Sequence, residues 1–352
     1  MKIDEFFSVL RSGEWLRGTG SYSDIVISSR MRLARNIKGF PFSAKISQPQ
    51  KKEIISKVDS SLNQAKFSKP LFLFLMDDLN DLDRQFLMER HLVSLEHTQD
   101  PQGKAIFISK DETISILVNE EDHLRIQVIK SGFDLPLVWD VVNNIDEKMS
   151  SALDYCFSPD IGYLTSCPTN VGTGLRASVM VHLPGLIMTK RINRILELIA
   201  KLSFTARGLF GEGTQALGNF FQISNQVTLG SSELEIIENL TSIIKQLRSQ
   251  EEEARADLLL KHKLNLENKI WRSFGILQNA RIIDSAETLQ HLSLLRLGVD
   301  LGIIKGISYD MLNALFIITQ PAHLQKLHGK VLSVQMRDAL RASILREKLV
   351  IT

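Results

Sequence analysis

The sequence predicts an α+β protein: an antiparallel β-sheet flanked by helices, followed by an all-helical C-terminal domain. Three observations support this prediction. Short apolar or alternating segments joined by brief turns fill much of the first half of the chain. Short connections favour antiparallel pairing, because parallel strands need long crossovers. From residue 232 onward, apolar residues recur at helical spacing, and a length of 352 residues accommodates two domains.

Local patterns predict the elements of the first region. Residues 71–76 form an apolar run that predicts a buried strand, and residues 83–95 predict a helix. Four further segments have the pattern of strands, and the first two of them predict a hairpin: 105–109, 114–119, 124–129 and 220–228.

Capping signals predict the helices of the second region. Ser232, followed by Glu235 three residues later, fits a capping box at the start of a helix. Ser285 and Ser308 are expected N-cap residues, and Pro321 fits the first turn of another helix.

The charged run 251–253 marks the expected domain boundary. We therefore predict a catalytic region over residues 1–255 and a helical domain over residues 256–352.

Composition excludes several classes of protein. The longest unbroken apolar run, 71–76, is far too short to cross a bilayer, and residues 1–5 lack the apolar core of a secretory signal. Two cysteines do not make a disulfide framework, so we expect a reduced, cytoplasmic protein. With a net charge of +2 and no zinc-finger spacing or stacking motif, no direct contact with nucleic acid is expected.

Residues 167–178 are the most informative stretch of the chain. They combine Cys167 with Gly172, Gly174 and Arg176. The glycines allow a sharp turn and a close approach to a ligand, and an arginine offers a rigid fork of donors that fits phosphate or carboxylate. The pattern predicts an anion-binding loop beside a thiol, although a lone cysteine is more often a small buried apolar residue.

Arg30 and Arg32 follow the apolar stretch 25–27 and would point to the same face of an extended strand. Two neighbouring guanidinium groups repel each other unless an anion lies between them. The segment is therefore either a phosphate clamp or a solvated strand face that binds nothing.

The run 119–125 sets Glu121 and Arg125 where both can face one site. A carboxylate can hold a guanidinium group by two parallel hydrogen bonds and can accept its proton. The alternative is an exposed polar turn. His91 lies in a predicted helix and gains interest only beside other candidates.

Two later segments repeat the theme of arginine beside an acid. Residues 207–214 place Arg207 and Glu212 among glycines, which fits either a surface loop or a mobile loop that closes on a ligand. Arg337 and Arg341 lie four residues apart, on one helix face beside Asp338. That block is either the basic rim of an amphipathic helix or a pocket for a group that carries phosphate and guanidinium.

As a set, these residues suit phosphoryl transfer, which needs alignment and charge neutralisation rather than a covalent enzyme intermediate. Five arginines would neutralise a nucleotide with its Mg²⁺: Arg30, Arg32, Arg125, Arg176 and Arg207. Glu121 and Glu212 would hold and deprotonate a guanidinium group. The sequence contains neither a Walker-type phosphate loop nor the His-Arg-Asp catalytic loop of protein kinases.

The chain resembles the phosphagen kinases, which include the creatine and arginine kinases. The resemblance covers roughly residues 20–255 and rests on four motifs: Ser28-Ser29-Arg30-x-Arg32, the 119–125 block, the 167–178 block, and Arg207-Gly208 with Glu212. The chain lacks the long N-terminal helical domain of the small-molecule enzymes and carries a helical extension. In both features, and in its block at 337–342, it resembles the bacterial protein-arginine kinases over essentially its whole length.

The resemblance implies transfer of the ATP γ-phosphoryl group to arginine side chains of proteins, with ATP and Mg²⁺ as cofactors. It also implies a phosphoarginine-sensing pocket at Arg337, Asp338, Arg341 and Ala342, a helical domain that mediates dimerisation, and a homodimer or higher homo-oligomer. Implied partners are a zinc-containing activator protein and a Clp ATPase-protease that degrades the marked proteins.

By the same resemblance, Glu121 and Glu212 would bind the target guanidinium, one of them as the base, with Cys167 beside it. The positions expected to line the nucleotide are Ile27, Ser28, Ser29, Arg30, Met31, Arg32, His91, Arg125, Arg176, Ala177, Ser178, Val179, Met180, Arg207, Gly208, Leu209, Phe210, Gly211 and Glu212. Two alternatives stay open: a kinase for free guanidino compounds, and a non-catalytic adaptor that binds phosphoarginine.

Overall fold

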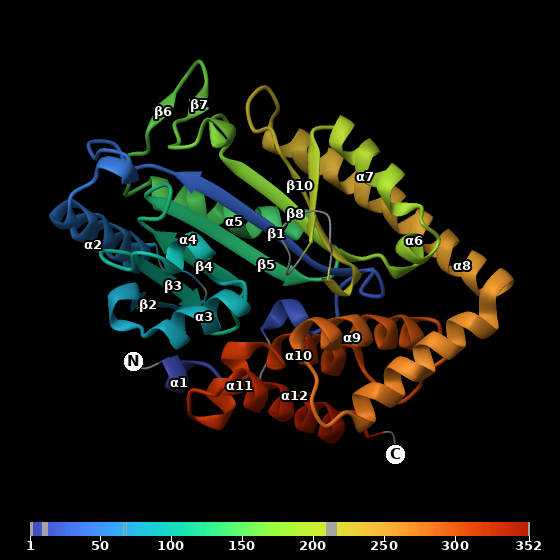
Figure 1. Ribbon diagram of the computed structural model, residues 1–352. Coiled ribbons are helices and arrows are strands. Elements are labelled where there is room, and N and C mark those ends of the chain that lie inside the picture. The colour runs from blue at the N-terminus through green and yellow to red at the C-terminus, as the bar shows by residue number, and fades with distance from the viewer. Residues whose placement is uncertain (1–2, 9–12, 66, 68, 209–216, 351–352) are drawn as a thin grey trace.

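The computed structural model describes residues 3–8, 13–65, 67, 69–208 and 217–350. Its centre is an antiparallel sheet of eight strands in the order β2-β3-β4-β5-β1-β8-β10-β9 (Figure 1). The strands of this sheet are β1 (Val26–Arg35), β2 (Leu71–Leu75), β3 (Ala105–Ser109), β4 (Ile114–Val118), β5 (Leu124–Ser131), β8 (Leu175–His182), β9 (Phe204–Gly208) and β10 (Phe220–Asn225). A separate hairpin consists of β6 (Phe157–Ser158) and β7 (Gly162–Tyr163).

Helices flank this sheet and make up the C-terminal region. The α-helices are α1 (Ile3–Phe6), α2 (Gln48–Gln64), α3 (Asp81–Glu89), α4 (Leu95–Thr98), α5 (Leu135–Ser150), α6 (Pro184–Met188), α7 (Ile192–Lys201), α8 (Glu233–Asn279), α9 (Ser285–Asp300), α10 (Tyr309–Ile318), α11 (Pro321–His328) and α12 (Val334–Lys348). Short 3₁₀ turns are η1 (Glu14–Leu16), η2 (Ser43–Lys45), η3 (Met76–Asp78), η4 (Pro168–Asn170) and η5 (Leu217–Asn219). The predicted α+β fold with a helical C-terminal region is confirmed.

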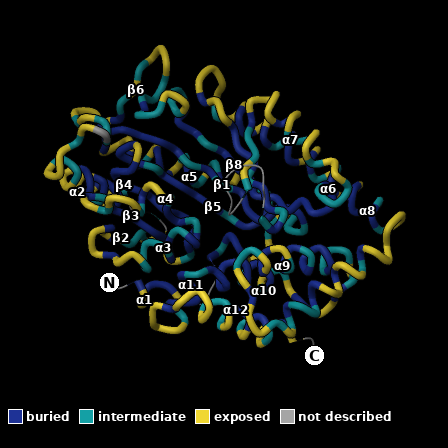
Figure 2. The backbone as a smooth tube through the Cα atoms, viewed as in Figure 1, coloured by how far each residue is buried: buried dark blue, intermediate teal, exposed yellow. Residues whose placement is uncertain are grey.

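One face of the sheet packs on α2, α5 and the first half of α8. Met31 from β1 and Ala177 from β8 lie in one apolar cluster with Val138 of α5 and Leu240 of α8. These strand residues are fully buried, and Figure 2 shows the buried backbone that runs through β1, β5 and β8. Burial of side chains on both sides makes the central strands a rigid base for any side chain that they carry.

The other face changes character along the strands. At one end, Ile129 and Met180 pack in a cluster with residues of the helical domain, such as Leu292 and Phe316. Helices α9–α12 gather below this end of the sheet in Figure 1. Toward the other end, the same face carries Arg125 and the other arginines described below. The helical domain therefore covers only part of this face.

A single helix, α8, joins the two regions. It begins with the predicted capping box, in which Ser232 and Glu235 bond each other's backbone N–H groups, and its helical geometry breaks at His262 (φ −138°, ψ 28°). Residues up to Ala254 pack under the sheet, whereas Leu258 and later residues pack in the helical domain. The division near residue 255 stays a prediction, and it falls inside this helix.

Two predicted elements differ from the structure. Residues 71–76 form a strand only to Leu75, and Leu73 and Leu75 are each 38% exposed, because β2 is the outermost strand on its side of the sheet. The helix predicted over 83–95 is α3, which ends at Glu89. His91 adopts a left-handed backbone conformation (φ 58°) that no α-helix accommodates, so the chain turns there before the short α4.

The other predictions are confirmed with small shifts in their boundaries. The hairpin is β3–β4, and the late alternating segment is β10, which ends at Asn225. Ser308 is the N-cap of α10, and Pro321 lies in the first turn of α11. Ser285 is the first residue of α9 rather than its cap, because the Asp284 carboxylate accepts the hydrogen bond from Glu287 N–H.

Candidate active site

Strand register brings the five predicted arginines to one face of the sheet. Arg32 of β1 lies directly opposite Arg176 of β8, and Arg30 has the same orientation two residues earlier. On the other side of β1, Arg125 of β5 lies opposite Ala34, which faces the same way as Arg32. Arg207 of β9 pairs with Gln222, which in turn pairs with Met180 of β8. Because side chains alternate along each strand, all five share one face.

Four of these arginines line one pocket with the predicted acid and thiol. The pocket has a volume of about 630 Å³. Its lining residues include Arg32, Ser94, Glu96, Lys104, Glu120, Glu121, Arg125, Cys167, Thr169, Asn170, Gly174, Arg176 and Arg207. Arg30 and His91 do not line it. Strands β1, β5, β8 and β9 thus converge with the start of α4 and the segments that precede β3, β5 and β8, which no local pattern in the sequence shows.

Like charges crowd the arginine face of the sheet, in the pocket and beside it. Burial, together with the neighbouring Arg125, lowers the pKa of Arg30 to about 9. Burial and the charges of Arg30, Arg125 and Arg176 also lower the pKa of Arg32 well below its ordinary value. The Nε atoms of Arg30 and Arg32 are buried, and neither has a hydrogen-bond partner among the described residues. Buried donors normally have partners, so this arrangement is suited to an anion.

Two carboxylates hold Arg125. Its Nη1 lies 2.5 Å from Oε1 of Glu120, and its Nη2 lies 3.5 Å from Oε2 of Glu121. Glu121 and Arg125 thus lie at one site, and they also contact each other, which the sequence analysis did not predict. Glu120 is buried and also accepts a 2.9 Å hydrogen bond from the Ser94 hydroxyl. Sequence reasoning missed Glu120, although the run of acids before Arg125 was the available signal.

The carboxylate of Glu121 is partly exposed to the pocket. Its side chain is 43% exposed, whereas that of Glu120 is 3% exposed. Partial burial raises the pKa of Glu121, Arg125 opposes this shift, and the neighbouring acids Asp122 and Glu120 add to it. A carboxylate with a raised pKa takes up a proton more readily, as a general base requires.

The Cys167 loop is fixed by backbone contacts. Cys167 precedes η4, and its Sγ lies 3.0 Å from the Thr169 hydroxyl. The Thr228 hydroxyl donates to the carbonyl oxygens of Thr169 and Val171. At Gly172 (φ 109°) a Cβ would collide with the Thr228 carbonyl oxygen, so this turn requires glycine. The half-buried thiol is thereby held at the pocket wall.

A buried bridge links the Glu121 and Cys167 loops. One oxygen of Asp122 accepts hydrogen bonds from Asn36 Nδ2 and from Ser166 N–H, both 2.7 Å long. Asn36 Oδ1 in turn accepts from His123 N–H at 2.9 Å. Asp122, next to Glu121, is thus hydrogen-bonded to Ser166, next to Cys167. Sequence reasoning missed this bridge because Asn36, Asp122 and Ser166 are far apart in the chain.

His91 lies against the arginine face, beside Arg30, and does not line the pocket. Its carbonyl oxygen accepts a 2.9 Å hydrogen bond from Gln127 Nε2, and Gln127 Oε1 accepts from Arg30. Its ring packs edge-on against Trp15, with centroids 5.2 Å apart. Burial and the charge of Arg30 lower the pKa of His91 to about 3, so the ring is neutral.

Several other positions expected to line a nucleotide are buried elsewhere. Met31, Ala177 and Val179 point into the cluster under the opposite face of the sheet, and Ser29 donates to the Gly132 carbonyl oxygen. On the arginine face the remaining members are also buried: Ile27, Ser28, Ser178 and Met180. The structure does not bring these side chains into the pocket, and their part in a nucleotide site stays a prediction.

The predicted mobile loop lies largely outside the described residues. Gly208 ends β9 beside Arg207. Leu209, Phe210, Gly211 and Glu212 fall outside the part of the chain that the structure describes, so the role expected of Glu212 stays a prediction.

The C-terminal block lies on α12, remote from the pocket. Arg341 is buried, and its guanidinium donates to the carbonyl oxygens of Thr319 and Ile283 and to the Ser285 hydroxyl. Asp338 Oδ1 lies 2.5 Å from Arg341 Nη1. Ala342 is fully buried, and Arg337 is half-buried. Within the described residues, the hydrogen bonds of Arg341 thus join α12 to the other helices of the helical domain.

Two family models match successive parts of the chain. Residues 53–254 match the model of the ATP:guanido phosphotransferase C-terminal catalytic domain. Residues 263–352 match the model of the protein-arginine kinase McsB C-terminal domain. The first model includes most of the residues that line the pocket but not Arg32 or Ala34 of β1, and the second covers the end of α8 and helices α9–α12.

Curated relatives match over nearly their full length. The protein-arginine kinase of Halalkalibacterium halodurans is 47% identical over 99% of this chain and 98% of its own length. That of Desulforamulus reducens is 46% identical over 96% of this chain and 95% of its own. The protein-arginine kinase of Bacillus subtilis is 45% identical over 95% of this chain and 93% of its own length.

Solved structures of similar fold are guanidino kinases. Lombricine kinase matches with a TM-score of 0.59 and 26% identity over 70% of this chain and 72% of its own. The duplicated taurocyamine kinase of Schistosoma mansoni matches with a TM-score of 0.60 over 86% of this chain and 49% of its own; at 21% identity it supports the fold alone. The chain therefore belongs to the ATP:guanido phosphotransferase family, on the branch of the protein-arginine kinases with their additional C-terminal domain.

Proposed function

We propose that the protein transfers the γ-phosphoryl group of ATP to arginine side chains of proteins. One observation carries the proposal: four arginines line one wall of a pocket that also contains Glu121 and Cys167. This arrangement offers a polyphosphate and a guanidinium group separate binding surfaces within reach of each other. The family models and the relatives at 45–47% identity support the same activity.

The basic side of the pocket fits the phosphates of ATP. Arg32, Arg125, Arg176 and Arg207 present donors at the surface of one rigid sheet, and Arg32 has a buried Nε without a partner among the described residues. Burial and the neighbouring positive charges lower the pKa values of Arg32 and Arg176, and a bound anion would relieve that charge crowding. Bound Mg²⁺ would neutralise further phosphate charge.

The acidic side fits the guanidinium group of the acceptor. In the transfer, a guanidinium nitrogen forms a bond to the γ-phosphorus while the bond from that phosphorus to the bridging oxygen breaks, and ADP leaves. The proton lost from the nitrogen passes to a carboxylate, a role that we assign to Glu121 or to Glu212, the second acid expected. Cys167 would stabilise the cationic acceptor beside this carboxylate without a covalent intermediate.

Protein substrates distinguish this proposal from a kinase for free guanidino compounds. Purified protein with Mg-ATP and an unfolded, arginine-containing protein should give acid-labile phosphate on arginine, detected by mass spectrometry that preserves phosphorus–nitrogen bonds. Free arginine and creatine should give little ADP. A clear preference for the free compounds, or binding of phosphoarginine without any transfer, would contradict the proposal.

The finer consequences of the resemblance are part of the same proposal. They are sensing of phosphoarginine by the block 337–342, assembly into a homodimer or higher oligomer, activation by a zinc-containing protein, delivery of marked proteins to a Clp ATPase-protease, and action in the cytoplasm. The chain's helices, over the described residues, include none long and apolar enough to cross a bilayer.

A further inference from the structure

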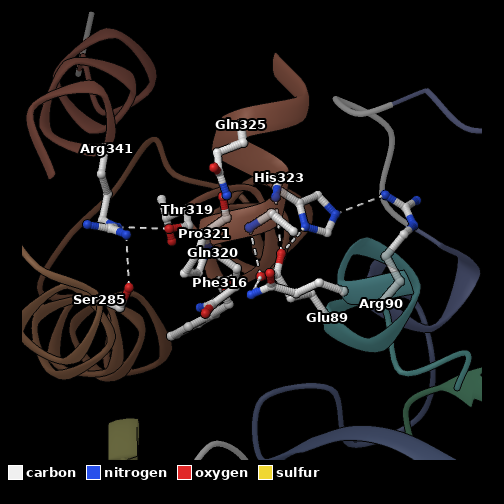
Figure 3. A network of polar contacts seen from close by, with 12 residues as sticks. Glu89, Arg90, Ser285, Phe316, Thr319, Gln320, Pro321, His323, Gln325 and Arg341 are labelled. Carbon is white, nitrogen blue, oxygen red and sulfur yellow. Dashed lines mark hydrogen bonds and ion pairs between the residues drawn. The ribbon is translucent and has the colours of Figure 1, made fainter. Parts of the chain in front are cut away.

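Glu89, the last residue of α3, reaches out of the catalytic region and binds the first turn of α11 (Figure 3). Its Oε1 accepts a 2.8 Å hydrogen bond from Ala322 N–H. Its Oε2 accepts from His323 N–H at 3.1 Å and from His323 Nδ1 at 2.8 Å. Glu89 and His323 are 8% and 0% exposed, so these bonds are shielded from water.

Glu89 takes the place of an ordinary helix cap. Helices α9, α10 and α12 are preceded by the N-cap residues Asp284, Ser308 and Ser333, whose own side chains accept the capping hydrogen bond. Gln320, at the corresponding position of α11, instead donates its side-chain amide to Phe316 O. The N-terminal donors of α11 are therefore satisfied by a carboxylate 233 residues earlier in the chain.

The contacts of His323 determine its tautomer. A carboxylate can only accept, so Nδ1 must carry the proton that bonds Glu89. A guanidinium group can only donate, and Arg90 Nη1 lies 3.3 Å from Nε2, so Nε2 must be the unprotonated nitrogen. Burial and the charge of Arg90 lower the pKa of His323, which agrees with a neutral ring. One histidine of the helical domain thus contacts two successive residues of the catalytic region.

The same short segment continues to the phosphate-binding face. Arg90 is fixed by Glu112, whose carboxylate oxygens lie 2.5 and 2.9 Å from Nη2 and Nε. The next residue, His91, makes the left-handed turn that directs its carbonyl oxygen at Gln127. Gln127 then orients the guanidinium of Arg30. Displacement of Glu89 would shift this turn and release Arg30 from its position.

We propose that Glu89 is a positioning residue for the nucleotide site: by holding the first turn of α11, it docks the helical domain and fixes the 90–91 turn that orients Gln127 and Arg30. This inference rests on the proposed function in that Arg30 belongs to the face that binds ATP phosphates. It goes further, because it makes nucleotide affinity depend on a contact between the catalytic region and the helical domain.

The test compares Glu89→Gln with a control at the same interface. Glu89→Gln keeps the size of the side chain but turns an NH₂ group toward donors. The control, Lys326→Gln, removes the ion pairs of α11 with Asp4 and Asp83 at the rim of the interface and leaves Glu89 intact. Binding of Mg-ATP to the full chain is measured calorimetrically, together with KM for ATP and kcat.

If the free energy of one charge-assisted contact is transmitted to the nucleotide site, it corresponds to about a tenfold weakening of ATP binding. We expect this rise in Kd and in KM for Glu89→Gln, with kcat at saturating ATP within about threefold of the parent. Lys326→Gln should bind ATP like the parent even if it melts at a lower temperature. Equal ATP affinity in Glu89→Gln and the parent, or equal weakening in both variants, would overturn the proposal.

A second variant and a spectroscopic measurement keep the test decisive if Glu89→Gln fails to fold. His323→Gln removes the ring donor to Glu89 but leaves both backbone donors, and ATP binding should weaken about threefold. In the parent, ¹⁵N shifts of the labelled His323 ring should show the Nδ1-protonated tautomer; the opposite tautomer would overturn the proposed contact. If the parent protein binds ATP normally but forms no phosphoarginine, that result would count against the proposed function and leave the positioning role of Glu89 intact.

Discussion

Arg32 and Arg176 lie directly opposite each other across β1 and β8, with their side chains on the same face of the sheet. Like charges in such cross-strand pairs are unfavourable. Burial is the main cause of the lowered pKa of Arg32, and the charges of Arg30, Arg125 and Arg176 lower it further. The free protein therefore retains an arrangement that a bound polyphosphate would stabilise.

Arg32→Gln should separate stability from function. Removal of one buried charge relieves repulsion, so the free variant should melt at or above the temperature of the parent. Loss of a preorganised phosphate donor should lower kcat/KM for ATP by about 100-fold or more. Calorimetry with and without Mg-ATP checks both effects: ATP should raise the melting temperature of the parent and not that of the variant. A variant that melts well below the parent would contradict the view that repulsion dominates here.

Glu121→Gln should abolish phosphoryl transfer and leave ATP binding within about twofold of the parent. The amide cannot accept the proton from the acceptor, whereas Arg125 keeps its 2.5 Å pairing with Glu120. A suitable control is Glu96→Gln, which removes an exposed carboxylate from the rim of the same pocket. Single-turnover measurement of phosphoarginine checks the prediction, and substantial transfer by Glu121→Gln would exclude Glu121 as the base.

Cys167 should react with iodoacetamide, and bound substrates should protect it. The thiol is half-buried and lines the pocket, so Mg-ADP with an arginine peptide should slow its alkylation about tenfold or more if they occupy the site. Cys156 lies outside the residues that line this pocket and serves as the internal control. Peptide mass spectrometry over time distinguishes the two thiols; equal protection of both would indicate a global change instead.

Acid should destabilise the protein because buried histidines stay neutral in the folded state. Burial lowers the pKa values of His91 and His97 to about 3, and those of His182 and His323 well below 6.5. Unfolded histidines take up protons near pH 6.5. The contribution of these histidines to stability is therefore complete above pH 6.5 and falls as pH decreases toward 3, by about 1.4 kcal/mol per pH unit for each histidine.

His97→Gln offers a check on this assignment. The glutamine amide can still donate to the Ala105 carbonyl oxygen, which His97 Nε2 contacts at 3.1 Å. The variant should lose less free energy of unfolding between pH 7 and pH 5 than the parent, as measured by urea titration. An unchanged pH dependence would assign the acid sensitivity to other groups.

The two arginines of the C-terminal block should respond differently to substitution. Arg341→Ala should cost about 3–5 kcal/mol of stability, because it leaves two carbonyl oxygens and the Asp338 carboxylate without their buried partner. Arg337→Ala removes one 3.2 Å bond to Leu332 O and should cost less than about 1 kcal/mol. Urea denaturation measures both, and a small effect of Arg341→Ala would show that its role is not structural.

Much of the fold could be predicted because its signals are local. The hairpin 105–118 and the caps at Ser232 and Ser308 depend on neighbouring residues. The end of α3 could not be predicted, since His91 carries no turn signal and adopts positive φ through tertiary contacts. The exposure of β2 follows from its place at the sheet edge, which the composition of the strand does not show.

The candidate site was predictable where residue types and short spacing carried the information, as for Arg30 with Arg32 and Glu121 with Arg125. Strand order alone decides that Arg32 meets Arg176. The Asn36–Asp122 bridge and the Glu89–His323 contact join segments 86 and 234 residues apart, and no local pattern reports them.

Helix α8 contributes side chains to both hydrophobic clusters. Leu240 and Leu247 pack in the cluster under the sheet, and Leu266 and Phe274 pack in the cluster of the C-terminal helices. A chain cut at residue 255 would end in mid-helix and lose the turns that continue it. Neither cluster can melt without fraying the helix on which the other depends. We therefore expect a single calorimetric transition in which both regions unfold together.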